Sequence, residues 1–220
     1  MYPNIWALIL SFILVFVVIG LSTLLQKLNI LGDEGARKFI HIGVSNWWFL
    51  VIYMFDSIWF AIIPPIIFII LNYASYKMNL IKSMERSGRG NLGTVYFPIA
   101  LLFFVIAAFT FSNAYVGAVS ILTLGYGDGF AAVIGKKYGK KRLENGKSLV
   151  GTITMFIVTY LVAMTLSIIY LNTSIPLILI GSLIVALVAT LTELFTPKGL
   201  DNLSIPLVVG LVVYGLLRII

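Results

Sequence analysis

The 220-residue sequence contains no cysteine and only one histidine. The absence of cysteine excludes disulfide bonds, thiolate nucleophiles and zinc sites built on thiolates. Charged residues are also scarce, at 10% of the chain, whereas hydrophobic residues make up 60% of it. An average soluble domain has about 25% charged residues. The composition therefore indicates an integral membrane protein.

Apolar runs recur along the chain, and a helix needs roughly 20 such residues to cross a bilayer. The block from 94 to 135 is too long for one span, so we divide it at the polar pair Ser112 and Asn113. A seven-span fold with one re-entrant element is the alternative to this division. The sequence predicts an all-α, polytopic transmembrane helical bundle that forms one membrane domain over residues 1–220. Its eight expected spans are 4–25, 38–55, 57–75, 94–111, 114–134, 149–170, 176–195 and 202–218.

The basic residues concentrate in alternate loops between the expected spans. With eight spans, these loops share one side of the membrane and hold every one of the 15 Lys and Arg residues except Arg218. The positive-inside rule makes that side cytoplasmic and places both termini outside. The net charge of +7 then follows from topology and from anionic headgroups. We expect a multi-pass protein of the cell membrane whose partner is the bilayer, not nucleic acid.

Three acidic residues, Asp128, Glu193 and Asp201, lie near the cytoplasmic ends of three separate expected spans. A carboxylate at the centre of a membrane helix costs about 3 kcal/mol on insertion scales, so it normally faces the protein interior and serves a function. Carboxylates delivered to a similar depth favour an oxygen-ligand magnesium site. Two structural alternatives stay open: Asp128 pairs with a nearby lysine, and Asp201 only caps the last helix.

A basic, glycine-rich loop at about 135–148 follows the segment that carries Asp128. It is not a Walker loop, because Lys141 stands where the first glycine of that motif belongs. The glycines at 125, 127 and 129 are more typical of close helix packing than of a dinucleotide fingerprint. The loop leads into a helix whose first amides favour a phosphate, so we predict a polyphosphate ligand. The candidate nucleotide-binding residues of the loop are Gly135, Lys136, Lys137, Gly139, Lys140, Lys147, Ser148 and Gly151.

The loop and its flanks resemble the CTP-dependent lipid kinases, a family that contains dolichol kinase, phytol kinase and the fungal CTP-using diacylglycerol kinase. Further elements of this resemblance lie elsewhere in the chain, so that it extends from residue 37 to residue 206. They are the RKxxH element of Arg37, Lys38 and His41, the GTVYFP segment at 93–98, and Glu193 followed by the DNxxxP element that begins with Asp201 and Asn202. One departure is that Leu149 and Val150 stand where many relatives have an acid.

The resemblance implies transfer of the terminal phosphate of CTP, or of another nucleoside triphosphate, to the hydroxyl of a membrane lipid alcohol. The acceptor would be a polyprenol, a phytol-like alcohol or diacylglycerol, and the reaction would depend on magnesium held by Asp128, Glu193 and Asp201. We add Arg37, Lys38 and Asn202 to the expected nucleotide site. Either His41 or a carboxylate such as Asp201 is the candidate to orient the acceptor hydroxyl or take its proton.

Two other functions remain as alternatives. Phosphatidate cytidylyltransferases are distantly similar around the CTP loop, but their closing element is missing, since FTPKGLDNLSIP follows Glu193. A small ion-coupled transporter would place its acids near the bilayer midplane and would carry an internal repeat. The acids of this chain are instead expected near one surface.

Overall fold

The computed structural model describes residues 2–78, 92–143, 146–197 and 199–219, and the regular elements in these ranges are helical. The N-terminal part contains α1 (Tyr2–Lys27), α2 (Asp33–Ser45), α3 (Trp48–Tyr53), α4 (Ile58–Ala61), α5 (Ile63–Met78) and α6 (Gly93–Thr110). The C-terminal part contains α7 (Ala114–Leu122), the π-helical turn η1 (Thr123–Asp128), α8 (Gly129–Tyr138), α9 (Leu149–Tyr170), α10 (Ile175–Phe195) and α11 (Asp201–Leu216). The expected all-α class is confirmed.

Within the described residues, six helices are long and apolar enough to cross a membrane, and the apolar helix α11 is shorter. The six are Tyr2–Lys27, Ile58–Met78, Gly93–Thr110, Ala114–Tyr138, Leu149–Tyr170 and Ile175–Phe195. The expected division near residue 112 is confirmed, because Ser112 adopts a positive φ of 49° and the Asn113 side chain caps the next helix by accepting from the Tyr115 amide. This polar corner separates α6 from α7.

The single helix expected at 38–55 is wrong, since α2 ends at Ser45 and α3 begins at Trp48. The side-chain amide of Asn46 donates to the carbonyl of Ile42 at 2.9 Å, and such local bonds compete with the backbone hydrogen bonds of a helix. The interruption lets two adjacent indoles point to different neighbours. Trp47 donates to Ser11 of α1 at 2.7 Å, and Trp48 donates to the Ala114 carbonyl at the start of α7 at 3.0 Å.

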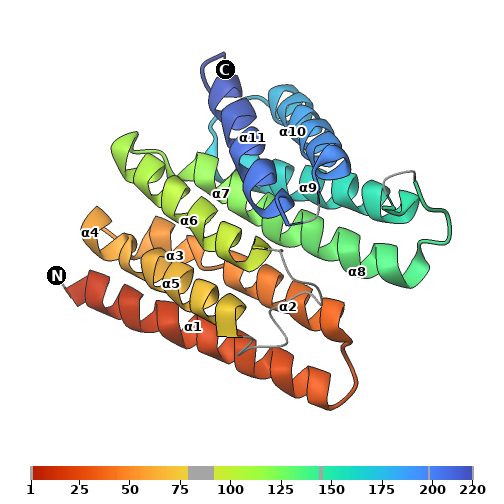
Figure 1. Ribbon diagram of the computed structural model, residues 1–220. Coiled ribbons are helices and arrows are strands. Elements are labelled where there is room, and N and C mark those ends of the chain that lie inside the picture. Colours follow the sequence, from red (N-terminus) through yellow and green to blue (C-terminus); the bar gives the residue numbers. More distant parts are fainter. Residues whose placement is uncertain (1, 79–91, 144–145, 198, 220) are drawn as a thin grey trace.

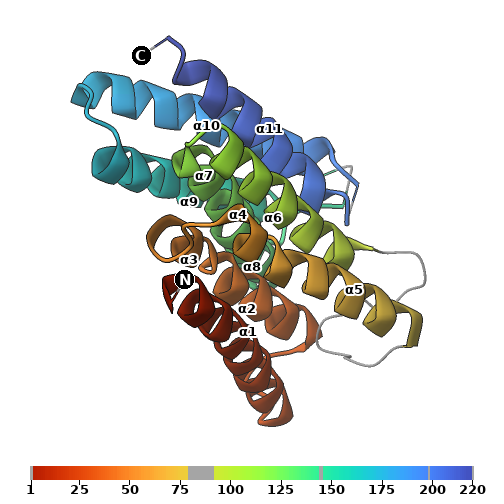
Figure 2. The same cartoon turned by 90° about the vertical axis from the view of Figure 1, so that its left-hand side faces the viewer.

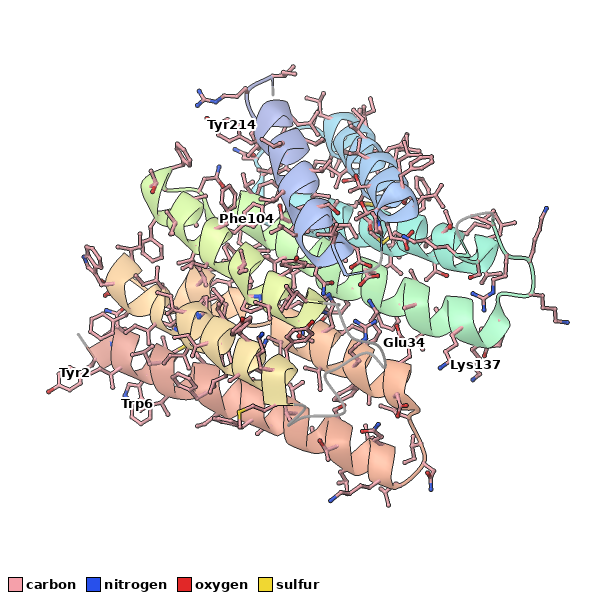
Figure 3. The ribbon with its side chains drawn as sticks, viewed as in Figure 1. Tyr2, Trp6, Glu34, Phe104, Lys137 and Tyr214 are labelled. Atoms are coloured by element: carbon pink, nitrogen blue, oxygen red, sulfur yellow. The ribbon has the colours of Figure 1, made fainter. Side chains whose placement is uncertain are left out.

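The segment from α7 to α8 is the centre of the bundle (Figures 1 and 2). In its 18-residue apolar stretch, 72% of the residues are buried inside the protein, whereas the corresponding share in α1 is 22%. In both views α8 lies between α2 and α9, which contact it on either side. The outer helices instead carry exposed apolar side chains, such as Tyr2 and Trp6 of α1 (Figure 3), as expected where lipid surrounds them.

Three glycines allow α2 and α9 to approach this central segment closely. A Cβ added at Gly125 would lie 2.1 Å from Ser45 Oγ, one at Gly127 would lie 2.7 Å from Thr159 Oγ1, and one at Gly129 would lie 2.5 Å from Ile42 Cγ1. The packing interpretation of these glycines is therefore confirmed. The π-helical turn that spans Gly125 and Gly127 was not predicted, and turns of this kind often occur at functional sites.

We expect Gly125→Ala to destabilise the protein by ~1–3 kcal/mol, because the new methyl group overlaps Ser45 in a packed interior. Gly20→Ala in α1 is the matched control, since nothing lies within 4 Å of its added Cβ and alanine favours a helix. Thermal unfolding of the detergent-solubilised variants measures the difference. Equal stability of the two variants would contradict the close approach of α2 to η1.

Candidate functional site

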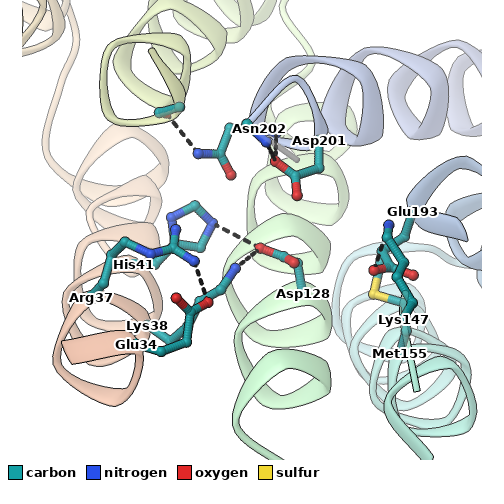
Figure 4. Close-up of polar contacts among 12 residues, drawn as sticks. Glu34, Arg37, Lys38, His41, Asp128, Lys147, Met155, Glu193, Asp201 and Asn202 are labelled. Carbon is teal, nitrogen blue, oxygen red and sulfur yellow. Dashed lines mark hydrogen bonds and ion pairs between the residues drawn. The ribbon is translucent and has the colours of Figure 1, made fainter. Parts of the chain in front are cut away.

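A buried ion pair joins α2 to η1. The Lys38 ammonium donates to Asp128 Oδ2, and the two side chains are 1% and 6% exposed (Figure 4). The Nε2 atom of His41 lies 3.8 Å from the same carboxylate oxygen. Lys38 and His41 are three residues apart, so they share one face of α2. The alternative that Asp128 pairs with a lysine is thus correct, although the pair does not exclude a further role for the carboxylate.

A second ion pair connects the basic loop to α10. Lys147 Nζ lies 2.8 Å from Glu193 Oε1, and both side chains are largely buried (Figure 4). The end of the loop is held by backbone bonds: Leu143 N donates to Lys147 O at 2.8 Å, and Leu149 N donates to Lys141 O at 3.2 Å. Gly146 adopts a φ of +78°, which favours glycine at this turn. The loop therefore presents Lys147 in a fixed position.

The next helix, α9, begins at a serine cap. Ser148 Oγ accepts from the Gly151 amide at 3.0 Å, so this side chain satisfies one of the free amides of the first turn. A Cβ at Gly135 would lie 2.6 Å from Ser148 Oγ, and one at Gly139 would lie 2.3 Å from Ser148 Cβ. These two glycines thus let the end of α8 pack against the start of α9.

The third predicted carboxylate, Asp201, begins α11. Its Oδ1 accepts from the amides of Gly199 at 2.9 Å and Asn202 at 3.0 Å, which orders the turn before the helix. The adjacent Asn202 crosses to another element, where its side-chain amide donates to the Gly93 carbonyl of α6 at 2.6 Å. Both side chains are buried.

These elements enclose a polar cavity of about 340 Å³. All three predicted carboxylates line it, together with cationic and small residues of α8, the loop and α9. Its walls are formed by Glu34, Asp128, Ala131, Ala132, Gly135, Lys136, Arg142, Gly146, Lys147, Ser148, Gly151, Thr152, Glu193 and Asp201. Cations beside carboxylates in a cavity of this size suit a polyanion and the divalent cation that accompanies it.

The carboxylates do not form a metal site by themselves. In the described part of the chain, no group of three or more Asp, Glu, His or Cys side chains is arranged to hold a metal ion, and each predicted carboxylate accepts from a protein donor. Magnesium, however, is commonly bound by one or two carboxylates, with substrate phosphates and waters completing its octahedron. The oxygen donors of the cavity fit an ion held in that way.

The remaining predicted residues lie at different places. Lys137 and Lys140 are exposed and do not line the polar cavity, nor does Gly139. Arg37, His41 and Asn202 line a second, mainly apolar cavity between α1, α2, α5 and α6. The structure thus brings together eight predicted residues in the polar cavity: Asp128, Gly135, Lys136, Lys147, Ser148, Gly151, Glu193 and Asp201.

Two charged residues of the polar cavity were not among the predicted site residues. Glu34 lies in the first turn of α2 and pairs with Arg37 at 2.5 Å. Arg142 lies in the basic loop, where a backbone bridge places it opposite Ser148. The sequence did hold a signal for Glu34. It is three residues before Arg37, and residues three apart are neighbours on the surface of a helix.

Curated relatives of this chain are phytol kinases. It is 29% identical over 203 residues to the phytol kinase of Synechocystis sp., an alignment that covers 88% of this chain and 84% of the relative. It is 30% identical over 211 residues to the chloroplastic phytol kinase 1 of Arabidopsis thaliana, covering 86% and 69%. It is 32% identical over 201 residues to the probable chloroplastic phytol kinase 1 of Oryza sativa subsp. japonica, covering 81% and 63%.

No family model and no solved structure matches the chain. The sequence relatives nevertheless cover most of it, and they confirm the resemblance to the CTP-dependent lipid kinases. This multi-pass membrane protein therefore belongs to the phytol kinase family of CTP-dependent lipid kinases.

Proposed function

We propose that the protein transfers the terminal phosphate of CTP to the hydroxyl of a phytol-like membrane alcohol, with magnesium as the accompanying cation. The observation that carries this proposal is the polar cavity, into which three distant segments bring Asp128, Glu193 and Asp201 beside the lysines of one loop. Membership of the phytol kinase family supports the same reaction.

The triphosphate occupies the part of the cavity between the loop and the start of α9. Lys136, Arg142 and Lys147 supply positive charge there, and the N-terminal end of α9 adds its dipole and its remaining free amides. Phosphoryl transfer needs mainly positioning and charge stabilisation. A fixed loop with several cations meets both needs.

Asp128, with Glu193 or Asp201, is the candidate set of magnesium ligands from the protein. A bound magnesium ion would neutralise charge on the β- and γ-phosphates during transfer. Before nucleotide binds, Lys38 and Lys147 balance the buried charges of Asp128 and Glu193, because an unpaired buried carboxylate would be costly. A triphosphate that binds here gives Lys147 a second anionic partner, which weakens the ion pair between Lys147 and Glu193.

His41 is the candidate to receive the proton of the acceptor hydroxyl. Its Nε2 is buried, makes no hydrogen bond within the described residues, and lies 3.8 Å from Asp128 Oδ2. An imidazole nitrogen in this position can accept a proton from a hydroxyl group. Asp201 lines the polar cavity and remains the carboxylate candidate for the same step.

We also propose that the chain crosses the membrane eight times. The six long apolar helices supply six crossings, α11 supplies another, and the interrupted pair of α2 and α3 supplies the eighth. The basic loop then lies on the cytoplasmic side by the positive-inside rule. Both termini lie on the opposite side, and the nucleotide enters from the cytoplasm.

Purified protein given γ-labelled CTP, magnesium and a phytol-like alcohol should transfer the label to the alcohol. Omission of magnesium should abolish the transfer, because the phosphate charge is then not neutralised. Thin-layer chromatography of the lipid fraction measures the product. Release of pyrophosphate with formation of a CDP-lipid would instead identify a cytidylyltransferase.

Asp128→Asn should lower kcat by roughly 10²–10³-fold, the loss typical when one charge-stabilising group is removed. It should also destabilise the fold, because Lys38 is left buried without a counter-charge. The double variant Lys38→Met/Asp128→Asn separates the two effects: it should regain thermal stability but not turnover. A double variant that regains turnover would remove Asp128 from the reaction.

A single cysteine at position 140 should react with a membrane-impermeant maleimide only from the cytoplasmic side. Lys140 is exposed in the basic loop, and the protein has no native cysteine to react in the background. Asn172→Cys, in the exposed turn between α9 and α10, is the matched control and should react only from the opposite side. Comparison of intact cells with inverted vesicles measures both, and reversed labelling would invert the proposed topology.

A further inference from the structure

A second cavity lies beside the polar one and is not explained by nucleotide binding. Its walls come from α1, α2, α5 and α6, with Asn202 of α11 at one end. It is a narrow cleft, with a volume of about 70 Å³ against about 340 Å³ for the polar cavity. A cleft of this shape suits one extended alkyl chain better than the two chains of a diacylglycerol.

One end of the cleft carries unsatisfied polar atoms. Arg37 Nε, His41 Nε2 and Asn202 Oδ1 all belong to residues that line it, and all three are buried atoms with no hydrogen-bond partner in the described part of the chain. A buried polar atom without a partner is unfavourable, so three on residues that line one cleft indicate a missing polar group. They offer one N–H donor together with an amide oxygen and an imidazole nitrogen.

His41 Nε2 is open to a ligand. It is buried and has no hydrogen-bond partner among the described residues, and on a neutral ring whose proton is on Nδ1 it is an acceptor. A hydroxyl group matches the whole set, since it can accept from Arg37 Nε–H while donating to His41 Nε2 or to Asn202 Oδ1.

Apart from Thr94 and Asn72, whose side-chain amide donates to the Thr94 carbonyl at 2.8 Å, the rest of the cleft is apolar. Val15 and Ile19 come from α1, Phe68 comes from α5, and Leu101 comes from α6. The outer faces of α1 and α5 carry exposed apolar residues such as Phe16 and Ile70. An alkyl chain that lies along these walls therefore continues into the lipid without passing a charged group.

Residues that line the two cavities lie close to one another, and Figure 4 shows four of them. Asp128 and Asp201 line the polar cavity, whereas His41, 3.8 Å from Asp128, and Asn202, next to Asp201 in sequence, line the apolar cleft. A hydroxyl beside His41 at the polar end of the cleft thus lies close to Asp128, the proposed ligand of the magnesium ion that accompanies the triphosphate. This juxtaposition fits an acceptor and a donor held on opposite sides of these residues.

We propose that the cleft is the acceptor site, which holds a single-chain, long alcohol with its hydroxyl among Arg37, His41 and Asn202 and its chain along Ile19, Phe68 and Leu101. The inference rests on the proposed kinase function. In the reaction, the hydroxyl oxygen forms a bond to the γ-phosphorus, the bond from that phosphorus to the β-phosphate oxygen breaks, CDP leaves, and the hydroxyl proton passes to His41 Nε2. The products are the alcohol monophosphate and CDP.

Photolabelling tests the site without requiring turnover. A long-chain primary alcohol with a diazirine in mid-chain is irradiated with the detergent-solubilised full chain in the absence of nucleotide, and the adducts are mapped by mass spectrometry. We expect adducts on α1, α5 and α6 at the cleft, which an unlabelled single-chain alcohol suppresses and the alkane of equal length does not. Adducts confined to the outer groove of Phe156, Tyr160 and Leu183 would overturn the proposal.

Ile19→Trp should fill the cleft, lower this labelling at least tenfold and raise KM for the alcohol at least tenfold, with KM for CTP unchanged. Leu183→Trp is the matched control, because it enlarges an exposed apolar residue in another groove, and it should leave both values as they are. If Ile19→Trp does not fold, Ile19→Ala should widen the cleft and improve the relative kcat/KM for a branched or bulkier alcohol. Unchanged labelling by a folded Ile19→Trp, or unchanged selectivity of Ile19→Ala, would overturn the proposal.

The outcomes separate the acceptor site from the proposed function. Cleft labelling that the alcohol suppresses, in a protein that transfers no phosphate, would retain the site and reject the kinase reaction. Phosphate transfer to an alcohol whose adducts lie outside the cleft would retain the kinase and reject the site.

Discussion

The buried ion pair between Lys38 and Asp128 is the constraint on which the rest of the structure depends. It joins residues 90 positions apart, and both side chains are almost fully excluded from solvent. Either charge alone would cost several kcal/mol in this interior, so α2 and η1 must stay together. Their closeness requires Gly125 and Gly129, where any side chain would overlap α2. The buried ion pair of the site therefore depends on the glycines of the central helix, which allow α2 to approach closely enough to form it.

The contact between α2 and η1 also separates the two cavities. Asp128 faces the polar side, and His41, one turn along α2 from Lys38, faces the apolar side. The closing residues of the chain repeat the division, because Asp201 lines one cavity and its neighbour Asn202 lines the other. Each cavity is thus lined by one residue of the contact between α2 and η1 and by one residue from the start of α11. A phosphate donor in water and an acceptor in lipid can then meet across a layer only a few side chains thick.

Much of this arrangement could be predicted from sequence, because membrane helices follow from long apolar runs and acids inside them are rare enough to mark a site. Asp128 and Glu193 were identified for that reason, and Lys147 was identified from the basic, glycine-rich loop. The break between α2 and α3 could not be predicted, since it depends on Asn46 capturing a local carbonyl and on indoles that bond to distant helices. Nor could Asn202 be separated from Asp201, because adjacent residues face different cavities only once α6 is in place.

The two lysine–carboxylate pairs differ in a way that matters for a reaction cycle. Lys38 comes from a packed helix and is 1% exposed, so its partner cannot leave without a replacement charge. Lys147 comes from a loop and is 12% exposed, and a phosphate in the same cavity can compete for it. A nucleotide would therefore loosen the pair of Lys147 with Glu193 first, while the pair of Lys38 with Asp128 continues to hold the scaffold. Because one ion pair is fixed and the other can exchange its partner, the cavity can accept a polyanion while the pair of Lys38 with Asp128 keeps α2 against η1.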